Sequence, residues 1–144
     1  KMDNILLIRN PREVLSSYIK KYKITSVNQL GYIQQIGLFK MFIENGLPYI
    51  IIDARNVLED PEGMLKGLCA RLTIPFYKEM LSWQAGRRDS DGIWGKYWYG
   101  NVERSTGFQI TNKNNDVLPM KYECIIEECM EHYQQLYQHR IRIV

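Results

Sequence analysis

One stretch near the start of the sequence constrains the fold more than any other: residues 5–18, which read ILLIRNPREVLSSY. Its four leading aliphatic residues form a short unbroken apolar run, typical of a strand buried on both faces of a parallel sheet. Asn10 and Pro11 then predict a helix start, because Asn caps helices and Pro fits the first turn. Glu13 is expected to complete a capping box with Asn10. Arg9 therefore lies where a strand hands over to a helix, an edge at which α/β proteins bind ligands.

Arg9 is the first candidate ligand-binding residue. Its guanidinium stays charged at any working pH and makes forked pairs with phosphate. Ser16 or Ser17, about two helical turns further on, can add a hydroxyl to the same anion. The structural alternative is that Arg9 caps the strand end and pairs with a carboxylate while Ser17 faces solvent. The pattern alone gives these two interpretations equal weight.

The remaining chain predicts an α/β fold in a single domain spanning residues 1–144. A second apolar run at 49–52, closed by Asp53, predicts another central strand. The alternation of strands and helices is that of a parallel α/β sheet, and because two strands make a poor sheet of this class, further strand partners are expected. Helices are predicted at 11–22, 27–45 and 118–138, with another beginning at Asp60-Pro61 and a short turn at 77–81.

Composition narrows the functional classes. The formal charge of +3 is too mild to indicate nucleic-acid binding by itself, and no apolar run approaches the ~20 residues of a membrane span. The three cysteines lack CxxC spacing, which predicts reduced thiols and a cytoplasmic protein. His132 and His139 share one face of the last predicted helix but lack further ligands, so no metal site is predicted. Asp53 and Asp60 are interpreted as structural.

A glycine- and aromatic-rich segment, residues 82–115, interrupts the helical pattern. Within it, Arg87, Arg88, Gly92 and Trp94 suit a flexible segment that closes over a phosphorylated, planar ligand. The alternative is a surface loop anchored by tryptophans on the core, and the residues alone favour that alternative.

Residues 9–18 (RNPREVLSSY) resemble the 3′-phosphate-binding motif of the sulfotransferases, which use 3′-phosphoadenosine 5′-phosphosulfate (PAPS) as sulfuryl donor. In that family an Arg at the strand end and a Ser eight positions later bind the 3′-phosphate, and here these positions are Arg9 and Ser17. Residues 49–53 and 58–61 are similar to the next strand of the family and to its following helix start. Residues 98–99 and 105–108 look like a bacterial branch of sulfotransferase-like proteins.

The late loop is similar to a family segment that closes on the cofactor with an Arg-Lys-Gly triplet and a nearby Trp. The nearest equivalents here are Arg87, Arg88, Gly92 and Trp94. The match departs from the triplet, because Arg88 replaces its Lys and Asp89 replaces its Gly.

The resemblance implies the C-terminal portion of a P-loop-type fold: a three-layer α/β domain whose parallel sheet is flanked by helices, with a long loop and a terminal helix. The 5′-phosphosulfate loop and the catalytic base are expected upstream of Lys1, so no catalytic residue is assigned. The implied partners are PAPS, its product adenosine 3′,5′-bisphosphate, and a small-molecule or glycan acceptor. The alternatives are a non-catalytic nucleotide-binding or interaction module and, ranked last, a weak nucleic-acid binder that uses Lys20, Lys21, Lys23 and the aromatic-rich segment.

Overall fold

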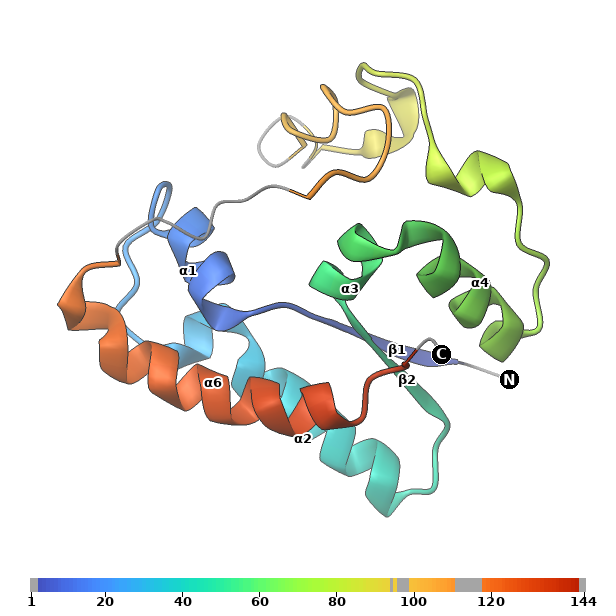
Figure 1. The fold of residues 1–144 in the computed structure, drawn as a ribbon. Helices are drawn as coiled ribbons and strands as arrows, with labels where there is room; N and C mark the ends of the chain where they lie inside the picture. The colour runs from blue at the N-terminus through green and yellow to red at the C-terminus, as the bar shows by residue number, and fades with distance from the viewer. Residues whose placement is uncertain (1–2, 94, 96–98, 111–117, 143–144) are drawn as a thin grey trace. The chain divides into compact units, whose positions relative to one another are not determined.

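The computed structural model describes the whole chain except residues 1–2, 94, 96–98, 111–117 and 143–144 (Figure 1). The chain forms two compact units. The first unit combines Lys1–Asn56 with Thr111–Val144, and the second comprises Val57–Ile110.

The first unit contains a strand–helix–helix–strand sequence followed, after the second unit, by a long helix. Among the described residues its elements are β1 (Asn4–Ile8), α1 (Pro11–Tyr18), the 3₁₀ turn η1 (Val27–Leu30), α2 (Tyr32–Glu44), β2 (Tyr49–Asp53), η4 (Met120–Tyr122) and α6 (Glu123–Gln138). Helix α3 (Ala54–Glu59), which follows β2 directly, was not predicted from the sequence. The alternation of helices and parallel strands confirms the α/β class.

The sheet of the described residues consists of β1 and β2, which pair in parallel. Asn4 pairs with Tyr49 and Ile8 pairs with Asp53, so the two strands start and end level with each other. Their carboxyl ends therefore lie at one edge. On the chain segment after α6, the Ile141 amide donates a hydrogen bond of 2.9 Å to the Ile51 carbonyl.

Strand β1 is buried on one face only, which corrects the prediction of a strand covered on both faces. Leu6 and Ile8 are buried, whereas Ile5 and Leu7 are 44% and 59% exposed. In β2, by contrast, residues 50–53 are all buried. Side chains alternate between the two faces of a strand, so helices packed on one face of β1 leave the other face open.

Helices α2 and α6 run side by side along the sheet and, with α1, enclose the core (Figure 1). Cys129, Tyr133 and Leu136 of α6 pack with residues of α2 and both strands in the main cluster. A second cluster joins Leu15 of α1 to Ile126 of α6. The helix predicted over 118–138 is present, although the α-helix itself begins at Glu123 rather than near Leu118.

Two predicted features of α1 and α2 are wrong in detail. The Asn10 side chain caps α1 by accepting from the Arg12 amide, but Glu13 pairs with arginine side chains instead of completing a capping box. Ser26 does form a capping box with Gln29, yet it caps η1, since Gly31 (φ 82°) interrupts the helix predicted over 27–45. A left-handed residue ends a helical run, and glycine adopts that conformation at the least cost.

Helix α2 buries only part of its apolar surface. Tyr32, Ile36, Phe39 and Phe42 face the core, whereas Leu38 and Met41 of the same helix are 44% and 41% exposed. The helix therefore buries one face and leaves other apolar side chains exposed.

The second unit contains α4 (Pro61–Leu72), the turn η2 (Lys78–Leu81) and the turn η3 (Asp89–Asp91). Asp60 caps α4 by accepting from the Gly63 amide, as the Asp60-Pro61 pair predicted. The glycine-rich segment is closed at its base: Ser82 and Gly107 form an isolated antiparallel bridge, and the Trp83 indole donates to the Ser105 hydroxyl at 3.1 Å. This segment is therefore a loop with an organised base.

The three cysteines are free thiols, as predicted. Cys69 and Cys129 are buried and Cys124 is exposed. Burial raises the pKa of the Cys129 thiol to about 11.

Candidate functional site

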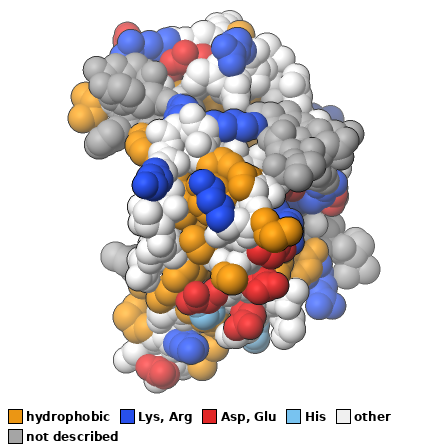
Figure 2. All heavy atoms as spheres, turned by 90° about the vertical axis from the view of Figure 1, so that its left-hand side faces the viewer, with side chains coloured by type: hydrophobic (Ala, Val, Ile, Leu, Met, Phe, Trp, Pro, Cys, Tyr) orange, Lys and Arg blue, Asp and Glu red, His pale blue; other side chains and the backbone are white. Residues whose placement is uncertain are grey.

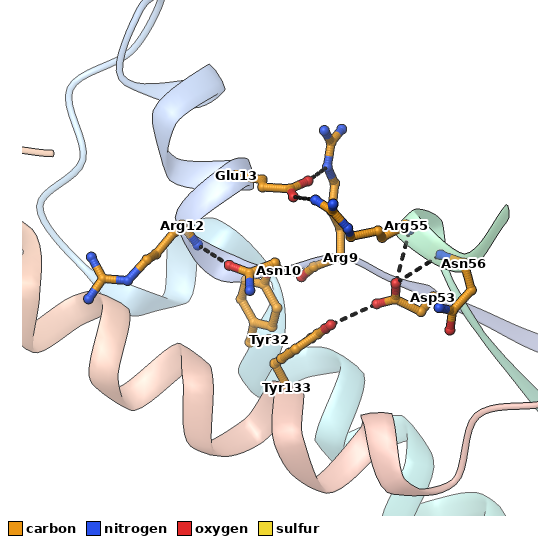
Figure 3. A network of polar contacts seen from close by, with 9 residues as sticks. All are labelled: Arg9, Asn10, Arg12, Glu13, Tyr32, Asp53, Arg55, Asn56 and Tyr133. Carbon is orange, nitrogen blue, oxygen red and sulfur yellow. Dashed lines mark hydrogen bonds and ion pairs between the residues drawn. The ribbon is translucent and has the colours of Figure 1, made fainter. Parts of the chain in front are cut away.

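Polar side chains gather in the first unit where β1 and β2 end (Figure 3). Arg9 follows β1 immediately, and Arg55 lies two residues after the end of β2. Between them Glu13 projects from the first turn of α1 (Figure 3). The level ends of the strands thus bring two arginines from distant parts of the sequence to one carboxylate.

Glu13 forms ion pairs with both arginines. Its Oε2 accepts from the Nε of Arg9 at 2.9 Å, and its Oε1 lies 3.4 Å from Nη1 of Arg55. The Arg9 guanidinium extends past Glu13, with its terminal nitrogens directed away from that carboxylate (Figure 3). Two positive charges and one negative charge leave the group with a net charge of +1. The pairing agrees with the structural alternative for Arg9, yet leaves the forked end of its guanidinium turned outward.

The backbone of Arg9 is held in place by a hydrogen bond from Tyr32 of α2. The Tyr32 hydroxyl donates a 2.7 Å hydrogen bond to the Arg9 carbonyl. Burial raises the pKa of the Tyr32 phenol well above its ordinary value, and the nearby Cys129 thiol adds to that effect. A phenol that stays protonated remains a hydrogen-bond donor, so the position of Arg9 is fixed over the working pH range.

Asp53 anchors the end of β2. Its buried carboxylate accepts from the Tyr133 hydroxyl at 2.8 Å and from the backbone amides of Arg55 and Asn56 at 2.9 and 3.3 Å. Burial and the hydrogen bond to Asp53 raise the pKa of Tyr133 well above its ordinary value. The carboxylate therefore fixes the start of α3, and with it the position from which Arg55 extends.

The two serines of the motif differ in environment. Ser16 is buried, whereas Ser17 is exposed. Ser17 lies four residues after Glu13 on α1, so the two side chains share one face of the helix. Its accessibility is compatible with the predicted role of Ser17 rather than Ser16 as the hydroxyl that binds an anion.

The predicted loop residues belong to the second unit. Arg87 and Arg88 are exposed, and the Arg88 amide donates to the Asp91 carboxylate at 2.9 Å. Gly92 has φ 66° and ψ −176°, a conformation that favours glycine. Trp94 lies outside the described residues.

Sequence reasoning missed Arg55 and the ion pairs of Glu13. The sequence did contain a signal for Arg55. This residue follows the second apolar run closely, and ligand-binding residues of α/β proteins lie just after the carboxyl ends of strands. Glu13 was explained as a capping residue, which concealed its pairing with two arginines.

Surface charge, metal-binding groups and membrane-spanning helices were the other features considered in the sequence, and the structure bears on each. On the face shown in Figure 2, Lys and Arg side chains occur at several separate places, and acidic side chains are seen both at the top and in the lower part of the view. Within the described ranges, no group of three or more His, Cys, Asp and Glu side chains is arranged to hold a metal ion. None of the described helices combines the length and apolarity needed to span a bilayer.

Two curated plant proteins share sequence similarity with nearly the whole chain. They are branched-chain-amino-acid aminotransferase-like proteins 2 and 1 of Arabidopsis thaliana, each 35% identical over 136 residues. The alignment covers 94% of this chain and 24% of each relative, so the chain spans about a quarter of the length of the curated relatives it matches. No solved structure matches the chain.

The family model described as a sulfotransferase domain matches residues 2–139. The matched range includes β1, α1, β2 and the whole Arg9–Glu13–Arg55 group. The motif at residues 9–18 was the first indication of this relationship, and the family match extends it over almost the entire sequence. The chain belongs to the sulfotransferase domain family.

Proposed function

We propose that this chain provides the 3′-phosphate-binding part of a sulfotransferase that uses PAPS, within a three-layer P-loop-type fold. The observation that carries the proposal is the position of Arg9 at the carboxyl end of β1, with the terminal nitrogens of its guanidinium directed away from Glu13 (Figure 3). A guanidinium in that orientation offers two parallel N–H donors, which match the oxygens of a phosphate monoester.

The residues around Arg9 suit a bound phosphate. The group formed by Arg9, Glu13 and Arg55 carries a net charge of +1, and the exposed Ser17 hydroxyl shares the helix face of Glu13. Together they offer charged and neutral donors, as a dianionic phosphate requires. On the strength of the family resemblance alone, the proposal also includes Arg87, Arg88, Gly92 and Trp94 as donor-binding residues.

The reaction proposed is in-line transfer of a sulfuryl group. An acceptor hydroxyl or amine attacks the sulfur, the bond from sulfur to the phosphate oxygen of PAPS breaks, and the acceptor proton leaves to a base. The products are the sulfated acceptor and adenosine 3′,5′-bisphosphate. The role of Arg9 and Ser17 is to hold the nucleotide in position, which contributes to the rate by orienting the reacting atoms. The base and the residues that hold the 5′-phosphosulfate are not assigned.

The plant relatives are named for aminotransferases, and we propose no such activity for this chain, because it spans only a quarter of those proteins. The alternative of a non-catalytic nucleotide-binding or interaction module makes the same binding prediction but differs in turnover. A weak nucleic-acid binder is disfavoured, since the formal net charge of the chain is only +3.

Ligand binding to the protein that contains this chain tests the proposal. Adenosine 3′,5′-bisphosphate is expected to bind more tightly than adenosine 5′-phosphate by isothermal titration calorimetry. Arg9→Ala should lower the preference for the bisphosphate by about 10- to 150-fold, since losing a charge-assisted pair costs about 1.5–3 kcal/mol. Arg12→Ala is the matched control, because Arg12 lies on the same helix but pairs with Glu123 of α6.

Equal affinity of the unmodified protein for the two nucleotides would remove Arg9 from a 3′-phosphate site. A transfer assay then separates the two functional classes. Formation of adenosine 3′,5′-bisphosphate from PAPS in the presence of candidate acceptors supports the enzyme, whereas binding without turnover supports the non-catalytic module.

A further inference from the structure

Arg55 is the residue of this site that neither the sequence motif nor the family resemblance assigns. It lies two residues beyond β2, and the register of Ile8 with Asp53 places the ends of β1 and β2 side by side. Arg9 and Arg55 thus extend from neighbouring strand ends although 46 positions separate them in the sequence.

The two guanidiniums meet at Glu13. One carboxylate oxygen pairs with each arginine, at 2.9 Å for Arg9 and 3.4 Å for Arg55. The Glu13 carboxylate thus uses one oxygen for each guanidinium. An oxyanion with two accessible oxygens can pair with two guanidiniums in the same way. The side chains of Arg9 and Arg55 are 44% and 40% exposed, whereas that of Glu13 is 20% exposed, so both arginines are accessible to a ligand from solvent.

The backbone of Arg55 is anchored at the end of β2 by a hydrogen bond to a buried carboxylate. Its amide donates to the buried Asp53 carboxylate, which also accepts from Tyr133 of α6. The first turn of α3 is therefore tied to the core. A side chain that extends from an anchored position loses less freedom when it binds a ligand.

We propose that Arg55 is a second phosphate-binding arginine, which acts with Arg9 on the same anionic group of the ligand. This inference rests on the proposed function for the identity of the ligand, the 3′-phosphate of the donor. Glu13 holds the two guanidiniums next to each other. A site with two arginines favours a nucleotide that carries this dianionic phosphate over a nucleotide that lacks it.

The experiment compares four proteins: the unmodified protein, Arg9→Ala, Arg55→Ala and the control Arg12→Ala. Each is titrated with adenosine 3′,5′-bisphosphate, adenosine 5′-phosphate and inorganic phosphate. Arg55→Ala is expected to lower the preference for the bisphosphate about tenfold, since a charge-assisted hydrogen bond contributes about 1.5 kcal/mol or more. Arg12→Ala should leave the preference unchanged. Arg55→Gln serves as the second variant if Arg55→Ala does not fold.

The outcomes separate the inference from the proposed function. If Arg9→Ala lowers the preference and both Arg55 variants leave it unchanged, Arg55 is not a ligand and the proposed function stands. A loss in the Arg55 variants without one in Arg9→Ala also overturns the inference, because the two residues would not share an anion. If the unmodified protein shows no preference but binds inorganic phosphate in a manner that both substitutions abolish, the two-arginine site stands and the donor assignment fails. Absence of both forms of binding overturns both.

Discussion

The hydroxyl of Tyr133 donates a 2.8 Å hydrogen bond to the buried carboxylate of Asp53, and 80 positions separate the two residues. This bond ties α6 to the end of β2, at the edge where Arg9 and Arg55 emerge (Figure 3). Because Asp53 also accepts from two amides of α3, the buried charge is distributed over three donors.

Removing the Tyr133 hydroxyl should destabilise the fold. In Tyr133→Phe the buried Asp53 carboxylate loses one of its three donors, and we expect the free energy of unfolding to fall by about 1–3 kcal/mol. Urea denaturation measures the change. Tyr137→Phe is the control, since Tyr137 lies one turn further along α6 and its ring packs against both Tyr133 and Arg140. A similar loss in both variants would show that the effect does not come from the bond to Asp53.

Glycine substitutions should have opposite effects at two positions close together in the sequence. Gly31 has φ 82°, so Gly31→Ala forces an L-residue into the left-handed region at a cost of about 1–2 kcal/mol. Gly37 lies within α2, and a methyl group there meets no atom within 4 Å, so Gly37→Ala should stabilise by about 0.5–1 kcal/mol. Thermal denaturation of both variants checks the signs, and destabilisation by Gly37→Ala would contradict the described environment of α2.

The protein should lose stability in mildly alkaline solution. Burial raises the pKa of Cys129 to about 11, whereas an unfolded thiol titrates near about 8.5. Between these values the folded state keeps a proton that the unfolded state has released. The free energy of unfolding therefore falls as the pH rises, by up to about 1.4 kcal/mol per pH unit for one proton. Below about pH 8.5 this contribution is fully present.

Denaturation by urea from about pH 8 to about pH 10 tests the thiol contribution over the interval in which it changes. Cys129→Ala should reduce the slope of stability against pH, whatever its effect on absolute stability. Cys124→Ala should not, because Cys124 is exposed. Tyr32 and Tyr133, whose pKa values burial also raises, should extend the loss above about pH 10 in every variant. An unchanged slope in Cys129→Ala would rule out the thiol as its source.

The base of the late loop depends on one indole hydrogen bond. Trp83→Phe removes the bond from the indole to Ser105 and leaves an aromatic ring beside Phe108, which Trp83 now contacts edge to face. We expect the free energy of opening the loop base to fall by about 1 kcal/mol, which should raise hydrogen-exchange rates in the adjoining loop segments about fivefold. Exchange measured by mass spectrometry should show no change in α2. Equal acceleration in both regions would indicate global destabilisation instead.

Local signals predicted the elements of this fold well because they depend on neighbouring residues. Asn10-Pro11 and Asp60-Pro61 mark helix starts through bonds within three positions, and the structure has helices beginning at both prolines. Gly31 was overlooked because a glycine in the left-handed conformation does not interrupt the spacing of the apolar residues around it.

The candidate site was only half predictable. Arg9 and Ser17 lie within one motif, whereas the pairing of Glu13 with Arg55 and of Asp53 with Tyr133 depends on strand register and on helix packing across long sequence separations. Ile5 and Leu7 show the same limit. A run of aliphatic residues predicts burial, but only the tertiary arrangement determines which face is covered.

The hydrogen bond from the Ile141 amide to the Ile51 carbonyl has a practical consequence for protein engineering. Ile141 is buried and lies beyond the last turn of α6. A truncation at the end of α6 would therefore remove it. Such a cut would leave a carbonyl of the more buried strand without its donor and open the core beside Ile51. Purification tags and fusion partners should therefore be joined downstream of Ile141, with a spacer that leaves this residue in place.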